Sequence, residues 1–188
     1  MILLILGVAL FAGLHLFTTL WRPVREGGIA RIGAGPWKGL IAVGLIASIW
    51  LIGRGYGEAS AAILWNAPDW LRYVIVIGML PAFILFFGSF SGSALRTRIR
   101  HPQLTGVKLW AALHLLANGD VRSLVLFGGL LAWAVVEVIL LNRRDGKPPL
   151  PAPDASAMKA WTAVPVGVVV WGLLLVAHPV LFGVSPFA

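Results

Sequence analysis

Six long runs of apolar residues constrain the fold of this chain more than any other feature of its sequence. A helix needs about 20 residues to cross the hydrocarbon core of a bilayer, and about 17 are enough. Hydrophobic residues make up 59% of the chain and the mean hydropathy is +0.90, more than a soluble domain of 188 residues can bury. The sequence predicts an all-α integral membrane protein, a bundle of about six transmembrane helices in a single domain over residues 1–188. The runs are Ile2–Leu20, Trp37–Ile52, Leu71–Phe90, Leu104–Ala117, Ser123–Leu141 and Ala160–Phe182.

The fourth run, Leu104–Ala117, is the shortest, with 14 residues. It would cross the membrane with the help of flanking residues or of a thinner bilayer, and otherwise it would be partly re-entrant. We expect it to be a span.

The basic residues predict how the spans are oriented. Cytoplasmic connections of membrane proteins are rich in Lys and Arg. The first, third and fifth connections and their borders hold 12 of the 15 basic residues, and the alternate connections hold the other three. Both termini are therefore expected on the side away from the cytoplasm. The majority are Arg22, Arg25, Arg31, Lys38, Arg96, Arg98, Arg100, Lys108, Arg143, Arg144, Lys147 and Lys159, and the minority are Arg54, Arg72 and Arg122.

Two segments need separate interpretation. The first run has no basic region before it and no clear cleavage site, and Trp21-Arg22-Pro23 follows it directly, so we interpret it as a retained helix and not as a signal peptide. The connection from Asn142 to Lys159 holds Pro148, Pro149, Pro151 and Pro153, which predicts an extended cytoplasmic loop.

The chain has no cysteine. This excludes disulfides, thiolate metal sites, iron–sulfur clusters and covalently attached c-type haem. The sequence also lacks the glycine-rich phosphate and dinucleotide motifs, HExxH and GxSxG. The net charge of +8 is explained by membrane topology, and we expect the bilayer as a partner and no nucleic acid.

Two histidines, His15 and His114, lie inside apolar runs, where an ionisable side chain is costly and is a functional candidate. Neutral imidazole is a ligand of metals and of haem iron. His15 would lie about 9 Å from the cytoplasmic end of its helix and His114 about 20 Å from His101, a difference in depth that helix tilt would have to close. The alternative is that each imidazole bonds to a backbone carbonyl and only packs.

The stretch around His101 predicts a second kind of site. Pro102 suits the first turn of a helix, and Arg96, Arg98 and Arg100 come just before it. Such a positive helix start suits a carboxylate, a phosphate or a haem propionate, although an ordinary basic border touching lipid phosphates would have the same residues. Asn118 follows His114 by four residues, so its amide could steady that imidazole. Asn118-Gly119-Asp120 is also a helix-ending turn, which explains the asparagine equally well.

Lys108 and Glu137 are further charged residues inside apolar runs. Their expected depths match, and an unpaired charge there would be expensive, so the sequence predicts an ion pair between their helices. His15 falls in the same layer, which would be either a structural pair or a proton-handling site.

Several of these residues together resemble the NnrU family, which is related to zeta-carotene isomerase. The resemblance rests on Arg100-His101-Pro102-Gln103, Gly106, Trp110, His114 and Asn118-Gly119-Asp120, with Gly13-Leu14-His15 and Arg22-Pro23 in the first run. It implies a bacterial inner-membrane protein linked to denitrification, with both termini then periplasmic. The isomerase branch implies a b-type haem, ligated by His15 and His114, and cis–trans isomerisation of an apolar polyene. His101 would be a further essential site without an assured role as a ligand.

Two other functions stay open. The run Arg100–Gly106 is also similar to isoprenylcysteine carboxyl methyltransferases, which use S-adenosylmethionine. Those enzymes usually carry a Tyr where this chain has Leu104, and their later acidic pair and Tyr-containing stretch are missing after Asn142. The last possibility is a non-enzymatic accessory protein of nitrogen-oxide metabolism in which the histidines only pack.

Overall fold

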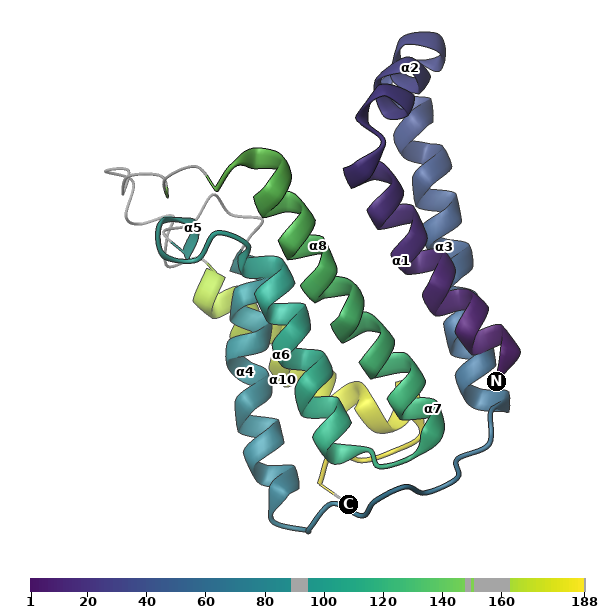
Figure 1. Cartoon of the computed structure of the whole chain (residues 1–188). Coiled ribbons are helices and arrows are strands. Elements are labelled where there is room, and N and C mark those ends of the chain that lie inside the picture. Colours follow the sequence, from purple (N-terminus) through teal and green to yellow (C-terminus); the bar gives the residue numbers. More distant parts are fainter. Residues whose placement is uncertain (89–94, 148–149, 151–162, 188) are drawn as a thin grey trace. The chain divides into compact units, whose positions relative to one another are not determined.

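The computed structural model describes residues 1–88, 95–147, 150 and 163–187 (Figure 1). Within these ranges every regular element is a helix, and extended backbone pairs only at an isolated bridge between Ile63 and Asp120. The elements are α1 (Ile2–Leu20), α2 (Arg22–Ile32), α3 (Ala34–Glu58), α4 (Leu71–Gly88), α5 (Leu95–Arg98), α6 (Pro102–Ala117), α7 (Val121–Ser123), the π-helix η1 (Leu124–Gly128), α8 (Gly129–Asp145) and α10 (Ala163–Phe182).

Each apolar run of the sequence forms a helix, which confirms the all-α prediction. The boundaries differ most at α3, which was expected to end at Ile52 and continues to Glu58. Arg54 pairs with Glu58 at 2.5 Å across one turn, a spacing that supports a helix. The first connection contains a helix of its own, α2, in which Pro23 occupies the first turn.

The chain forms two compact units. The first consists of residues Met1–Trp65 and Gly119–Gly146, and the second of Asn66–Asn118 and Lys147–Ala188. The single domain expected over residues 1–188 stays a prediction. The extended loop expected from Asn142 to Lys159 starts later than predicted, because α8 continues to Asp145 and ends at Gly146. Residues 148–149 and 151–159 of that loop lie outside the described residues.

In the first unit α1 packs along α3, and the two helices run side by side (Figure 1). Glycines make this contact close: a Cβ on Gly7 would lie 2.7 Å from the backbone nitrogen of Ile52, and one on Gly55 would collide with the backbone of Leu4. Small residues at a helix interface allow backbones to approach in this way. α8 packs against α1 on another side, where Val8 fills the space above Gly129.

In the second unit α4 packs against both α6 and α10. Glycines again mark the contacts, because a Cβ on Gly106 would lie 2.7 Å from the carbonyl oxygen of Ala82, and one on Gly167 would lie 2.7 Å from Cα of Ile84. The indole Nε1 of Trp171 donates a hydrogen bond to the carbonyl of Val76 at 3.0 Å, which ties α10 to α4.

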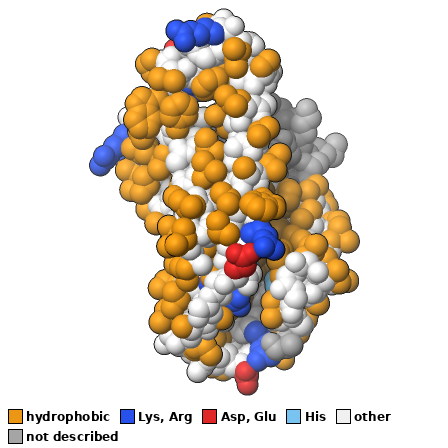
Figure 2. Space-filling view, turned by 90° about the vertical axis from the view of Figure 1, so that its right-hand side faces the viewer, with side chains coloured by type: hydrophobic (Ala, Val, Ile, Leu, Met, Phe, Trp, Pro, Cys, Tyr) orange, Lys and Arg blue, Asp and Glu red, His pale blue; other side chains and the backbone are white. Residues whose placement is uncertain are grey.

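The helices carry apolar side chains on their outer surfaces. Within the described residues, four helical stretches are long and apolar enough to span a membrane: Ile2–Leu20, Ala34–Glu58, Val121–Asp145 and Val164–Phe182. Val43 is 65% exposed, Ile77 70% and Val176 81%, values that suit contact with lipid and not with water. Figure 2 shows one face on which hydrophobic side chains predominate. The chain is an all-helical membrane protein.

The two remaining apolar helices are shorter. Leu71–Phe87 of α4 is a short apolar helix. α6 has 16 residues and begins at Pro102, two residues before the expected Leu104. The full crossing of the membrane by α6 therefore stays a prediction.

The orientation can be tested directly because the chain has no native cysteine. We expect Asp69→Cys and Phe187→Cys to react with a membrane-impermeant maleimide in intact cells, and Arg98→Cys and Leu150→Cys to react only after lysis. Labelling of Arg98→Cys from outside would contradict the crossing of α4, and labelling of Leu150→Cys from outside would contradict the predicted orientation as a whole.

Candidate functional site

His15 lies on α1 in contact with two aromatic side chains. Its Nδ1 is 2.9 Å from the carbonyl oxygen of Phe11, one turn earlier. Its ring lies 4.5 Å from the ring of Phe11 and 4.7 Å from that of Trp133 on α8. A carbonyl only accepts hydrogen bonds, so this contact favours the tautomer that carries its proton on Nδ1 and its lone pair on Nε2.

His114 on α6 repeats the same local arrangement. Its Nδ1 is 2.9 Å from the carbonyl oxygen of Trp110, again one turn earlier, and the two rings lie 4.9 Å apart. The tautomer argument is therefore the same as for His15. The amide of Asn118 donates to the backbone carbonyl of His114 at 2.8 Å and so closes the end of α6. Asn118 thus ends the helix as predicted, with its amide on the backbone carbonyl of His114, and its role beside the imidazole stays a prediction.

The two histidines belong to different units, His15 to the first and His114 to the second. Their joint ligation of one iron stays a prediction. Among the described residues, no group of three or more His, Cys, Asp or Glu side chains could hold a metal ion. A haem would not need such a group, because its iron takes at most two ligands from the protein.

His101 is the N-cap of α6, with Pro102 at the first helical position, as the sequence predicted. Its carbonyl accepts hydrogen bonds from the backbone nitrogen and the hydroxyl of Thr105, each at 2.9 Å. Arg100 and His101 are half-buried, whereas Arg98 is exposed. The side chain of Arg96 lies outside the described part of the chain. These residues stay candidates for binding an anionic group.

Glu137 of α8 is buried, with an exposed fraction of 6%, and accepts a hydrogen bond through Oε1 from the hydroxyl of Thr19 on α1. Within the described residues, its Oε2 has no hydrogen-bond partner. Thr19 lies one turn beyond His15, and Glu137 one turn beyond Trp133, so the two contacts form successive layers between α1 and α8. Lys108, which was expected to pair with Glu137, belongs to the other unit, and that pairing stays a prediction.

Replacing Thr19 with valine should cost about 1–2 kcal/mol of stability, because Oε1 of Glu137 then loses its donor in a buried place. Thr19→Ser should cost less, since it keeps the hydroxyl. In a Glu137→Leu background the cost of Thr19→Val should largely vanish. Unfolding of the purified protein by SDS would measure all of these variants. Equal costs of Thr19→Val in both backgrounds would mean that the two side chains are not coupled.

A polar cluster lies at the other end of the first unit, where α3 meets α7. The hydroxyls of Tyr56 and Ser123 are 2.7 Å apart, and Asp120 accepts from both the backbone nitrogen and the hydroxyl of Ser123 at 2.9 Å. The guanidinium of Arg122 lies 4.6 Å from the centre of the Tyr56 ring. This cluster fixes the start of the α7–α8 segment, and only the turn residues Asn118-Gly119-Asp120 pointed to it in the sequence.

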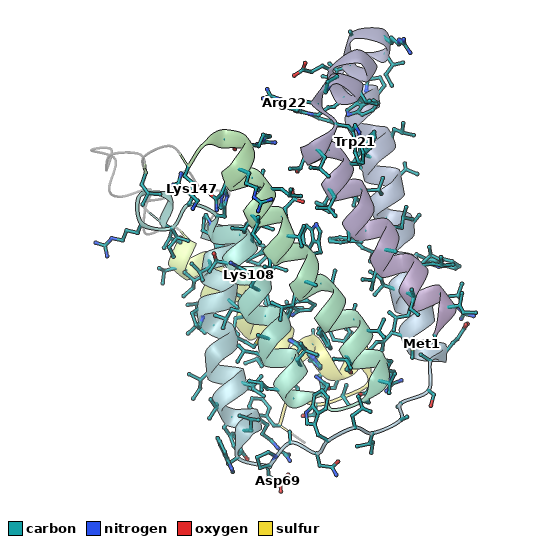
Figure 3. All side chains as sticks on the ribbon, viewed as in Figure 1. Met1, Trp21, Arg22, Asp69, Lys108 and Lys147 are labelled. Atoms are coloured by element: carbon teal, nitrogen blue, oxygen red, sulfur yellow. The ribbon has the colours of Figure 1, made fainter. Side chains whose placement is uncertain are left out.

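The first unit also contains an open pocket of about 370 Å³, beside the Thr19–Glu137 contact. It is lined by Thr19, Leu20, Arg22, Leu140, Arg143 and Arg144. We refer to it as the arginine pocket. Arg22 follows the break between α1 and α2, next to Trp21 (Figure 3). The sequence marked these arginines only as part of a basic border.

His178 differs from His15 and His114 in its hydrogen-bond partner, which lies beyond the end of its helix. Its Nδ1 is 2.7 Å from the carbonyl of Val184 in an exposed contact, and its ring packs on Phe182 at 4.8 Å. This agrees with an ordinary histidine near a helix end, and it makes His178 a suitable control position.

Comparison with known proteins gives one family. No curated protein and no solved structure matches the chain. A family model described as NnrU protein matches residues 3–186, nearly the whole chain and both units. The chain belongs to the NnrU family.

Proposed function

We propose that this NnrU-family membrane protein binds haem b non-covalently, with His15 and His114 as the ligands of the iron. The observation that carries the proposal is the repeated geometry of the two imidazoles. Each has its Nδ1 2.9 Å from the carbonyl one turn earlier, which favours the tautomer with the lone pair on Nε2. A hydrogen bond on one ring nitrogen is how proteins commonly orient an imidazole that ligates a metal through the other.

The donor set of the chain suits haem and few other metal groups. Because the chain has no cysteine, imidazole is the side chain left to ligate a haem iron. The surroundings of His15 are aromatic and apolar, as the face of a porphyrin requires. Arg100 and His101 would bind the propionates through charge-assisted hydrogen bonds. Trp133 and Phe11 would hold the ring of His15 in place, and Trp110 would do the same for His114.

The haem, when bound, would supply an iron able to act on a double bond or to bind nitric oxide. The substrate that best suits exposed apolar helices is an apolar polyene, which reaches the protein through the bilayer, so we propose cis–trans isomerisation as the activity. A redox or nitric-oxide-linked role in denitrification is the second form of the same proposal. Its place would be a bacterial inner membrane.

An absorption spectrum of the purified protein tests the proposal. We expect a Soret band with the intensity of one haem per chain, either in the protein as isolated or after addition of haemin. The wavelength of this band should be that of a low-spin, six-coordinate iron. Absence of any stoichiometric Soret band after haemin addition would contradict it. Saturable binding of S-adenosylmethionine in place of haem would favour the methyltransferase alternative.

The accessory-protein alternative has one observation in its favour. The carbonyl contacts of His15 and His114 also satisfy a ring nitrogen of each within its own helix, which lowers the cost of burying an imidazole that does nothing else. The two functions predict opposite results in the spectrum, because packing alone requires no iron.

A further inference from the structure

The arginine pocket has the composition of a binding site for an anion at a membrane border. Arg22 comes from the start of α2, and Arg143 and Arg144 from the last turn of α8. Leu20 and Leu140 supply apolar lining at the same place. Guanidinium groups suit phosphate because they offer several donors in a fixed plane.

The charge of the pocket is only partly neutralised by the protein itself. Arg144 donates from Nε and Nη2 to the carboxylate of Asp145, at 2.7 and 2.9 Å. Arg22 lies 3.6 Å from Glu26, and both side chains are more than half exposed, so water screens this pair. Arg143 has no acidic partner among the residues that the structure describes. The carboxylate of Glu137 also acts electrostatically on Arg144. The donors that remain available to a ligand are therefore those of Arg143 and of Arg22, whose pair with Glu26 is screened by water.

The neighbouring surface shows which kind of anion fits. Val136, Ile139, Leu140 and Arg143 share one stripe of α8, because their spacing follows the helical repeat. Val136 is 42% exposed and Ile139 44%, so an apolar track leads along the helix toward the pocket. Trp21 is 53% exposed beside Arg22, and tryptophan favours the level of the lipid headgroups.

We infer that the arginine pocket binds the phosphate of an anionic membrane phospholipid, with the acyl chains along the exposed apolar stripe of α8. A basic pocket at the end of membrane helices, continuous with a lipid-facing surface, is suited to such a headgroup. A soluble phosphate would use the arginines but not the apolar track. This inference does not depend on haem, because none of the proposed haem-binding residues lines the pocket.

The test compares two variants of the full chain that lose the same charge. Arg22→Gln with Arg143→Gln removes two arginines from the pocket, whereas Arg25→Gln with Arg31→Gln removes two exposed arginines of α2 that do not line it. The probe is phosphatidylglycerol, titrated into the detergent-purified protein, with native mass spectrometry to measure the dissociation constant of the first bound lipid. Phosphatidylcholine is the neutral lipid for comparison.

We expect the loss of each arginine to raise the dissociation constant of the first phosphatidylglycerol about 5-fold. The pocket variant, which loses two arginines, should therefore bind it about 25-fold more weakly. The control variant should change by less than about 3-fold, because exposed charges outside the pocket act only through a screened field. Binding of phosphatidylcholine should not change. Arg143→Gln alone, at an exposed position in the last turn of α8, should already weaken binding about 5-fold without affecting the fold.

Three results would overturn the inference. The first is unchanged affinity for phosphatidylglycerol in both Arg143→Gln and the pocket double variant. The second is an equal loss in the pocket variant and the control, which would mean that only the net charge matters. The third is displacement of the lipid by millimolar inorganic phosphate, which would assign the pocket to a soluble anion.

Discussion

His114→Ala is expected to convert a low-spin, six-coordinate haem into a five-coordinate, high-spin haem, or to abolish haem binding. Two neutral imidazoles on one iron give the low-spin state, and removal of one leaves an open position. His15→Ala should have the same effect for the same reason. Absorption and electron paramagnetic resonance spectra of the purified variants measure the change, together with the amount of haem per chain.

The control for this experiment is His178→Ala. The Nδ1 of His178 lies 2.7 Å from the carbonyl oxygen of Val184, beyond the end of α10, so its replacement should leave the spectrum unchanged. If His114→Ala kept the wild-type low-spin spectrum, the assignment of that ligand would be wrong, and His101→Ala would be the next variant to measure. The same spectral change in His15→Ala, His114→Ala and His178→Ala would indicate that the variants lose their fold, which circular dichroism would reveal.

The helices themselves could be predicted from the sequence because their signal is local. Each apolar run is long relative to a strand, and a membrane requires every backbone group to be satisfied within its own segment, which favours helices. Helix ends were less predictable. Gly53, Gly55 and Gly57 weaken the helical signal after Ile52, yet α3 continues to Glu58. Its last turns pack against α1, and Gly55 allows the two backbones to come close there. The π-helix η1 had no sequence signal at all.

The candidate site was predictable in part. An ionisable residue in an apolar run is visible in the sequence, and this singled out His15, His114 and Glu137. Their partners were not visible, because Thr19 and Trp133 are ordinary members of apolar helices and their roles depend on which faces of α1 and α8 meet. The matched depth of Lys108 and Glu137 predicts an ion pair, which stays a prediction because the two residues belong to different units. In the structure, Glu137 accepts a hydrogen bond from the hydroxyl of Thr19.

The close packing of α1 on α3 leads to the largest effect on stability that we expect from a single methyl group. A Cβ on Gly55 would collide with the backbone of Leu3 and Leu4, and Leu4 is fully buried. Backbone atoms cannot rotate away as a side chain does, so Gly55→Ala must push the two helices apart. We expect a loss of about 3 kcal/mol, at the upper end of the usual cost of overpacking.

Gly53→Ala is the matched control, because it adds the same methyl group two residues earlier in the same helix. Nothing lies within 4 Å of the added Cβ there. Alanine favours a helix over glycine by roughly 1 kcal/mol, so this variant should be as stable as the wild type or more stable. SDS-induced unfolding, followed by circular dichroism, compares the two. Equal stability of both variants would mean that α1 and α3 do not meet at Gly55, and since α1 carries His15, the arrangement of the candidate site in the first unit would then be wrong as well.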